Sequence, residues 1–108
     1  MDQIKQTNGE MDQKDKKISE MNLQEIRGEI DQVDSVLKAA FLHRMQLVER
    51  VAEIKSKNGA PIYNPEREEA MIRRLTEDVD PQFISEYEEF IQSLLRISRS
   101  YQKKILGQ

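Results

Sequence analysis

A helical pattern of apolar residues dominates the first half of this chain. The apolar positions follow one another at intervals of three and four residues, apart from one interruption, and they are Leu23, Ile26, Ile30, Val33, Leu37, Ala40, Leu47, Val51 and Ile54. A capping residue at Asn22 and a glycine stop at Asn58-Gly59 predict the two ends of this helix. At about 1.5 Å per residue it extends roughly 54 Å, about twice the diameter of a compact domain of this size. One chain of 108 residues cannot cover such a rod, so we expect a partner chain, most simply a second copy related by a two-fold axis.

Two further helices are predicted in the second half of the chain. Asn64-Pro65 and Asp80-Pro81 each place a capping side chain before a proline, which suits the first helical position. We expect the helix after Asn64 to end near Val79, and the helix after Asp80 to reach Leu106-Gly107. Only four glycines and three prolines occur, and charged residues make up 34% of the chain. This composition, without an alternating strand pattern, predicts an all-α fold with three helices per protomer, one of them very long.

The composition also narrows the functional classes. Residues 1–20 are almost entirely polar and form no apolar stripe, so we expect a flexible tail there and one folded domain over residues 21–108. The net charge of −3 argues against a general nucleic-acid or anionic-membrane surface. Without cysteine, and with His43 as the lone histidine, no metal site or cofactor is expected. No apolar stretch resembles a signal peptide or reaches membrane-spanning length, so the expected compartment is the cytoplasm.

Arg44 interrupts the apolar face of the long helix, at the position that follows Ala40 in the pattern. A guanidinium keeps its proton, so burying it without an anionic partner is strongly unfavourable. No acidic residue stands three or four positions from Arg44 on either side. Either the apolar face opens to water at this point, or an anion approaches Arg44 from elsewhere, for instance as a ligand.

Lys55 and Arg27 can join Arg44 in one anion site. Lys55 lies eleven residues after Arg44, close to three full turns, so both side chains leave the helix in the same direction. Arg27 lies on the same side but roughly 25 Å before Arg44 along the axis, too far to share a small site within one chain. In an antiparallel dimer, Arg27 of one chain can reach Arg44 and Lys55 of the other. Alternatively, Arg27 and Lys55 are solvated residues on the flank of a coiled coil.

Polar residues also interrupt the apolar stripe of the last predicted helix. The stripe through Leu94 and Leu95 continues into Ser98 and Gln102, one turn apart. Small polar groups on an apolar face need hydrogen-bond partners, which a ligand, the helix backbone or water can supply. Glu68 lies in the first turn of the middle helix, where its charge is favourable with or without a functional role.

Taken together, these residues resemble the all-helical (type II) chorismate mutases. The resemblance covers about residues 22–106, and its elements are specific only in combination. They are Ile26-Arg27-x-x-Ile30-Asp31, Asp34-x-x-Leu37, Arg44-x-x-Leu47, Val51-Ala52-x-x-Lys55 and Pro61-Ile62-Tyr63-x-Pro65-x-Arg67-Glu68. The resemblance implies an intertwined helical homodimer with two equivalent active sites, each shared between the chains.

The resemblance also implies how the site holds its substrate, chorismate. Arg44 would bind one carboxylate of chorismate, and Arg27 from the other chain would bind the second. Lys55 and Gln102 would donate hydrogen bonds to the ether oxygen of the breaking bond, and Ser98 would contact a carboxylate.

The remaining implied contacts come from the middle helix and its cap. Glu68 would accept a hydrogen bond from the ring hydroxyl, helped by the backbone at Asn64, and Arg67 would have a supporting electrostatic role. Asn64 departs from relatives that carry aspartate at this position, a mild change if the contact is made by the backbone.

The implied reaction is the pericyclic conversion of chorismate to prephenate, in phenylalanine and tyrosine biosynthesis. It needs no nucleophile, general acid or metal, which suits a chain with no cysteine and no histidine cluster. Two alternatives remain at this stage. A lyase of the same fold that releases pyruvate from isochorismate would use the same cations. A non-catalytic dimeric helical interaction module would explain the apolar face, but neither Arg44 nor the pair Ser98 and Gln102.

Overall fold

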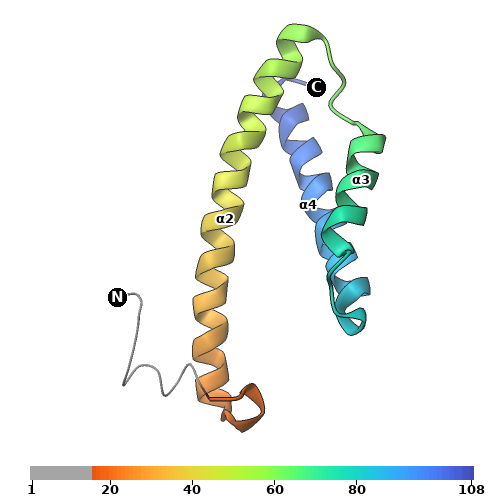
Figure 1. The fold of residues 1–108 in the computed structure, drawn as a ribbon. Helices are drawn as coiled ribbons and strands as arrows, with labels where there is room; N and C mark the ends of the chain where they lie inside the picture. Colours follow the sequence, from red (N-terminus) through yellow and green to blue (C-terminus); the bar gives the residue numbers. More distant parts are fainter. Residues whose placement is uncertain (1–15) are drawn as a thin grey trace, which may run out of the picture. The chain divides into compact units, whose positions relative to one another are not determined.

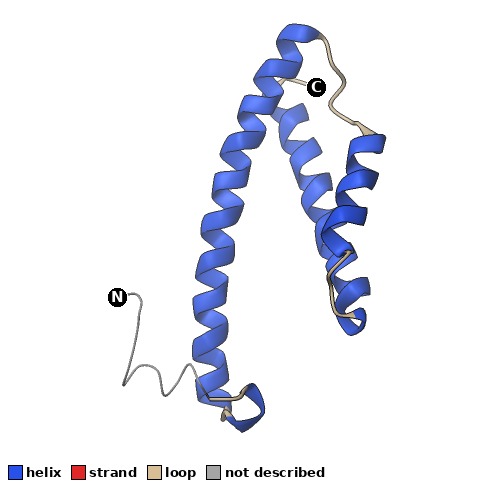
Figure 2. Ribbon diagram, in the orientation of Figure 1, coloured by secondary structure: helices blue, strands red, loops and turns tan. Residues whose placement is uncertain are grey.

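The computed structural model describes residues 16–108, and these residues form helices without any strand (Figure 1 and Figure 2). The three α-helices are α2 (Leu23–Asn58), α3 (Pro65–Thr76) and α4 (Ile84–Ile105), accompanied by two short 3-10 helices, η1 (Ile18–Glu20) and η2 (Pro81–Phe83). The prediction of an all-α fold with one very long helix is confirmed. The chain divides into two units, Met1–Ala40 and Phe41–Gln108.

The predicted polar tail lies mostly outside the described residues. Within its last part, Ile18–Glu20 form η1, and Lys16 pairs with Glu25 at 2.8 Å. The hydrogen bond from Lys16 lowers the pKa of the Glu25 carboxyl, with a smaller contribution from the backbone of Asn22.

Local capping explains where α2 begins and ends. The amide of Glu25 donates to the Asn22 side chain, and the amide of Asn22 donates to the Glu25 carboxylate, each at 2.9 Å. This reciprocal arrangement is a capping box, and it satisfies amides that have no partner inside the helix. After Asn58, Gly59 takes a φ of +73°, the left-handed conformation that ends a helix without a Cβ penalty.

Asn64 and Asp80 both act as caps, as the sequence predicts, but the helices that follow them differ from the prediction in two ways. Asn64 caps α3 by accepting from the Arg67 amide at 3.2 Å, and Asp80 accepts from the Gln82 amide at 3.2 Å. The first turn after Asp80 is the 3-10 helix η2, so α4 itself begins only at Ile84. Helix α3 ends at Thr76 rather than near Val79. The reason is that Asp80, which precedes a proline, must be extended, and the chain leaves the helix in time to reach it.

The core of the second unit lies where α3 and α4 pack side by side. Met71 of α3 is buried against Ile91 and Leu95 of α4, and Ile72, Leu75 and Tyr87 pack around them. The second half of α2 adds two buried residues, Val48 and Ala52. This packing holds the three helical segments around the pocket described below.

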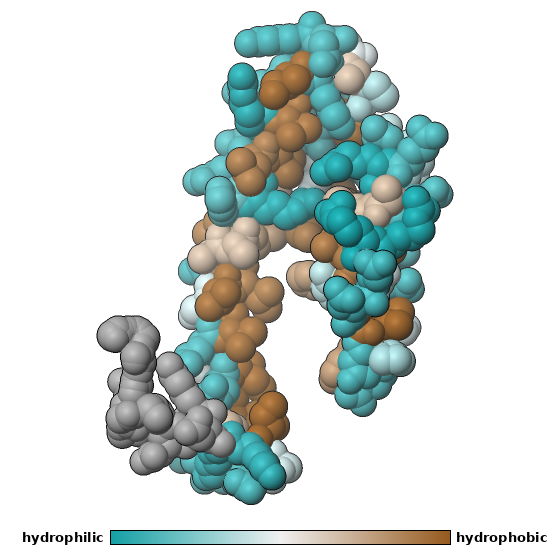
Figure 3. Space-filling model, viewed as in Figure 1, coloured by the Kyte–Doolittle hydropathy of each residue, from teal (hydrophilic) through white to brown (hydrophobic). Residues whose placement is uncertain are grey.

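The apolar face of α2 is largely exposed in the single chain. Large apolar residues line this helix in Figure 3, and those at least 49% exposed are Leu23, Ile30, Val33, Val36, Leu37, Leu42 and Leu47. Burying such side chains is worth about 1.5–3 kcal/mol each, so a face of this kind favours association. No helix in the described part of the chain has the length and apolar character needed to cross a membrane.

Candidate active site

A pocket of about 140 Å³ lies within the second unit, between the end of α2, the link to α3, and the facing sides of α3 and α4. All the predicted site residues except Arg27 line it, namely Arg44, Lys55, Asn64, Arg67, Glu68, Ser98 and Gln102. Apolar side chains complete the wall, among them Val48, Met71 and Leu95. The fold thus gathers residues separated by more than half the chain, while their chemical roles remain predictions.

Arg44 occupies the pocket wall that α2 contributes. Its Nη1 donates to the hydroxyl of Ser98, and that hydroxyl donates to the Leu94 carbonyl at 2.9 Å. Burial, and secondly the charge of Arg67, lower the pKa of the Arg44 guanidinium below its ordinary value. The group stays charged at neutral pH because even a lowered arginine pKa lies far above it. No acidic side chain among residues 16–108 forms an ion pair with Arg44, so an anion in the pocket would stabilise it.

Lys55 is held at the opposite end of the same wall. Its ammonium donates to the Ile62 carbonyl at 2.9 Å, which fixes the side chain against the link between α2 and α3. An ammonium has three donors, so two remain for other acceptors. Asn64, in contrast, uses its side-chain oxygen to cap α3. A contact from position 64 to a ligand can therefore come from its backbone or from the side-chain NH₂ group, which the cap does not use.

Gln102 brings a buried amide to the pocket. Only 5% of the residue is exposed, and its Oε1 has no hydrogen-bond partner among the described residues. Most buried polar side-chain atoms are paired, because an unpaired one costs about 1–3 kcal/mol. A half-turn of the amide exchanges oxygen for NH₂, so Gln102 can offer either an acceptor or a donor to a ligand.

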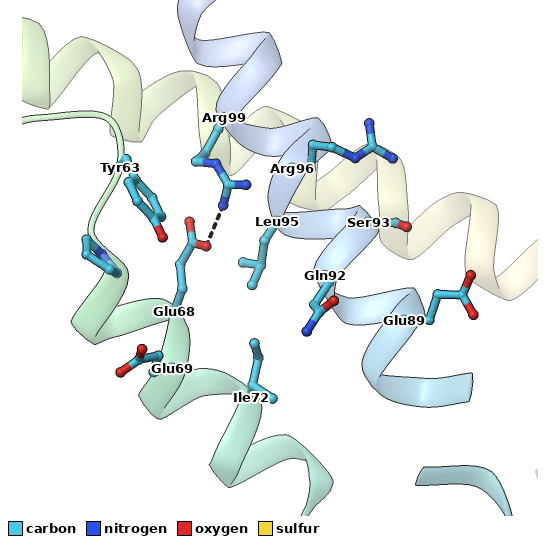
Figure 4. Close-up of a pocket in the computed structure, with 11 residues that line it drawn as sticks. Tyr63, Glu68, Glu69, Ile72, Glu89, Gln92, Ser93, Leu95, Arg96 and Arg99 are labelled. Atoms are coloured by element: carbon cyan, nitrogen blue, oxygen red, sulfur yellow. Dashed lines mark hydrogen bonds and ion pairs between the residues drawn. The ribbon is translucent and has the colours of Figure 1, made fainter. Parts of the chain in front are cut away.

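Arg99 is a pocket residue that the sequence reasoning missed. Its Nη1 pairs with Glu68 Oε1, and its guanidinium lies 4.9 Å from the ring centroid of Tyr63. Figure 4 shows these three side chains pointing toward one another, at a second cavity of about 440 Å³ that lies between α3 and α4. The signal was available, since Arg99 stands four residues after Leu95 on the apolar stripe of α4. It is the same kind of misplaced charge as Arg44.

The pocket carries a strong excess of positive charge. Four cations line it, Arg44, Lys55, Arg67 and Arg99, with one carboxylate, Glu68. Because Glu68 pairs with Arg99, three cations are left without an acidic partner in the described part of the chain. Such an arrangement suits a small anion of more than one charge. Across residues 16–108 there is no group of side chains that could hold a metal ion.

Arg27 and His43 do not line this pocket. Arg27 is exposed, belongs to the first unit, and is not among the pocket residues. His43, beside Arg44 in the sequence, is exposed to solvent.

Comparison with known proteins gives a consistent result. Residues 26–103 match the family described as chorismate mutase type II. A T-protein of Haemophilus influenzae is 45% identical over 51 residues, which are 47% of this chain and 14% of that protein. A bifunctional chorismate mutase/prephenate dehydratase of Aquifex aeolicus is 35% identical over 94 residues, 79% of this chain and 26% of that protein.

A shorter relative is a chorismate mutase of Methanocaldococcus jannaschii. It is 42% identical over 53 residues, 49% of this chain and 54% of that protein. The chain therefore spans about half of this relative and smaller parts of the other two. No solved structure matches the chain significantly.

Proposed function

The chain belongs to the chorismate mutase type II family, and we propose that it catalyses the isomerisation of chorismate to prephenate, a step of phenylalanine and tyrosine biosynthesis. The observation that carries the proposal is the pocket in which Arg44, Lys55 and Gln102 converge. The cations of this pocket without an acidic partner can bind a dicarboxylate, and the buried amide of Gln102 can form a hydrogen bond with the same ligand.

The reaction is a unimolecular rearrangement, so the first task of the protein is to select one conformer. Chorismate must fold its enolpyruvyl arm over the ring before the new bond can form. Arg44 binds one carboxylate and Arg27 of the partner subunit binds the other, which holds both ends in the reactive geometry. Ser98 contacts a carboxylate and also orients Arg44, as their hydrogen bond supports.

The second task is to stabilise charge on the ether oxygen as its bond to the ring lengthens. Lys55 and Gln102 donate to that oxygen from fixed positions, and each contributes about 3–4 kcal/mol by analogy with oxyanion-hole donors. Glu68 accepts a hydrogen bond from the ring hydroxyl, helped by the backbone of Asn64. Arg67 adds positive potential beside Arg44, consistent with its effect on the Arg44 pKa.

The proposal includes a homodimer in which two chains intertwine and share both active sites. Two observations support it. The apolar face of α2 is exposed from Leu23 to Leu47, so a single chain leaves it uncovered. Arg27, which the mechanism requires, lies outside the unit that contains the pocket. A second copy can cover the face and supply Arg27 together.

A substrate assay with the purified protein tests the function. We expect chorismate to disappear with matching appearance of prephenate, whereas release of pyruvate and salicylate from isochorismate would identify the lyase instead. A bicyclic mimic of the transition state should raise the melting temperature, because a ligand that binds only the folded state stabilises it. If the protein shows neither turnover nor a thermal shift, the proposal is wrong, and a helical interaction module is the remaining explanation.

A further inference from the structure

We propose that Arg99 is a positioning residue that keeps Glu68 paired and thereby leaves the other cations of the pocket available for the substrate. The inference rests on the proposed function, because it concerns the hydrogen bond between Glu68 and the ring hydroxyl. Arg99 reaches Glu68 from α4 across to α3, with side chains that are only 27% and 18% exposed (Figure 4).

Three cations line the active-site pocket together with Glu68 and Arg99. Arg44, Lys55 and Arg67 line the same pocket, and a carboxylate on a rotatable side chain is attracted to each of them. If Glu68 turned toward Arg44 or Lys55, it would neutralise a cation that the mechanism assigns to chorismate. Within residues 16–108, Glu68 instead pairs with Arg99, and none of those three cations has an acidic partner.

The geometry of the pair also leaves Glu68 ready to act. Arg99 uses Glu68 Oε1, and no hydrogen bond in the described part of the chain uses Oε2. One oxygen is thus fixed by a charge-assisted bond, and the other can accept from the substrate hydroxyl. Without Arg99, both oxygens are unrestrained.

A second contact holds Arg99 itself in place. Its guanidinium stacks on Tyr63, which lies in the link between α2 and α3. The neighbouring residue Ile62 provides the carbonyl that accepts from Lys55. Tyr63 therefore helps to fix the guanidinium that pairs with Glu68, while Lys55 has its own anchor in the Ile62 carbonyl.

A double-mutant cycle on kcat/KM tests the proposal with Arg99→Met, Glu68→Ala and the double variant. We expect Arg99→Met to lower kcat/KM by about tenfold to a hundredfold, the usual effect of losing a hydrogen bond to a charged group. In the Glu68→Ala background the same change should cost less than about twofold, because the carboxylate it positions is absent. Arg99→Lys should recover most of the loss, since it keeps the charge.

Arg96→Met is the matched control. Arg96 lies one turn earlier on α4 and lines the second cavity with Arg99, but it neither lines the active-site pocket nor pairs with Glu68. Its variant should stay within about twofold of the wild-type kcat/KM, as expected for a surface substitution. Circular dichroism melts record folding, and Arg99→Gln replaces Arg99→Met if the latter does not fold.

Two results overturn the inference in different ways. In the first, the wild type is active but Arg99→Met and Arg96→Met have equally small effects, or the losses of Arg99→Met and Glu68→Ala simply add in the double variant. This result removes the role of Arg99 and leaves the proposed function intact. A wild-type protein without mutase activity removes the proposed function, and this inference with it.

Discussion

Two side chains of the pocket are held in place by the fold and still have hydrogen-bonding groups available for a ligand. Lys55 is anchored to Ile62 by one donor and keeps two others, and Gln102 is buried with an unpaired oxygen. Groups that are already ordered and desolvated need no reorganisation when charge develops beside them, which is the condition for efficient electrostatic catalysis. The contribution of each is therefore measurable as a loss of turnover rather than of folding.

Lys55 gives the sharpest residue-scale prediction. We expect Lys55→Ala to lower kcat by about a hundredfold to a thousandfold, because the missing donor stabilises charge that grows only in the transition state. Steady-state conversion of chorismate to prephenate measures this effect. Lys57→Ala is the control, since Lys57 is exposed on the last turn of the same helix and does not line the pocket. A Lys55→Ala protein with near-normal turnover would contradict the assignment.

The sequence predicts a pocket residue most readily when that residue interrupts the apolar pattern of its helix. Arg44 was predictable because a charge on an apolar stripe needs an explanation, and Ser98 and Gln102 were predictable for the same reason. Arg99 carries that signal too, but its partners Glu68 and Tyr63 are distant in the sequence. Their meeting depends on how α3 packs on α4, which no local pattern contains.

At the scale of helices, the capping residues were more predictable than the helix ends and the 3-10 turn. Asn22, Asn64 and Asp80 cap through side-chain contacts to amides two or three residues away, so the sequence alone locates them. The early end of α3 at Thr76 and the 3-10 geometry of η2 were not predicted. Both reflect the path by which the chain turns back between two packed helices, which tertiary contacts decide.

The cap of α3 leads to a prediction about stability. Asn64→Ala should lower the free energy of unfolding by about 1 kcal/mol, because the Arg67 amide loses its acceptor at the helix start. Asn64→Asp retains an acceptor and adds a negative charge at the helix N-terminus, so it should be at least as stable as the wild type. Denaturant unfolding followed by circular dichroism compares the three proteins. Equal stability of Asn64→Ala and wild type would show that this cap contributes nothing.

At the scale of the whole molecule, the exposed apolar face of α2 and the position of Arg27 both favour association with a second copy of the chain. None of the residues from Leu23 to Ala40 is buried in the single chain, although apolar residues recur throughout that range. A partner chain thus remains a prediction, made from helix length and supported by this exposed face. The register between two such chains cannot be predicted from the pattern along either one, because it depends on how the two surfaces fit.

A mixed-dimer experiment tests whether the active site is shared. If Arg27 serves the pocket of the partner subunit, Arg27→Ala and Lys55→Ala homodimers are both impaired. Mixing them by joint unfolding and refolding should then restore about one quarter of the wild-type activity, since half of the dimers are mixed and each has one intact site. The control mixes Arg44→Ala with Lys55→Ala, whose residues belong to one pocket, and should restore nothing. If the active site were completed within one chain, neither mixture would recover activity, and the shared site would be contradicted. Recovery only in the mixture of Arg27→Ala with Lys55→Ala would require a substrate held between two subunits.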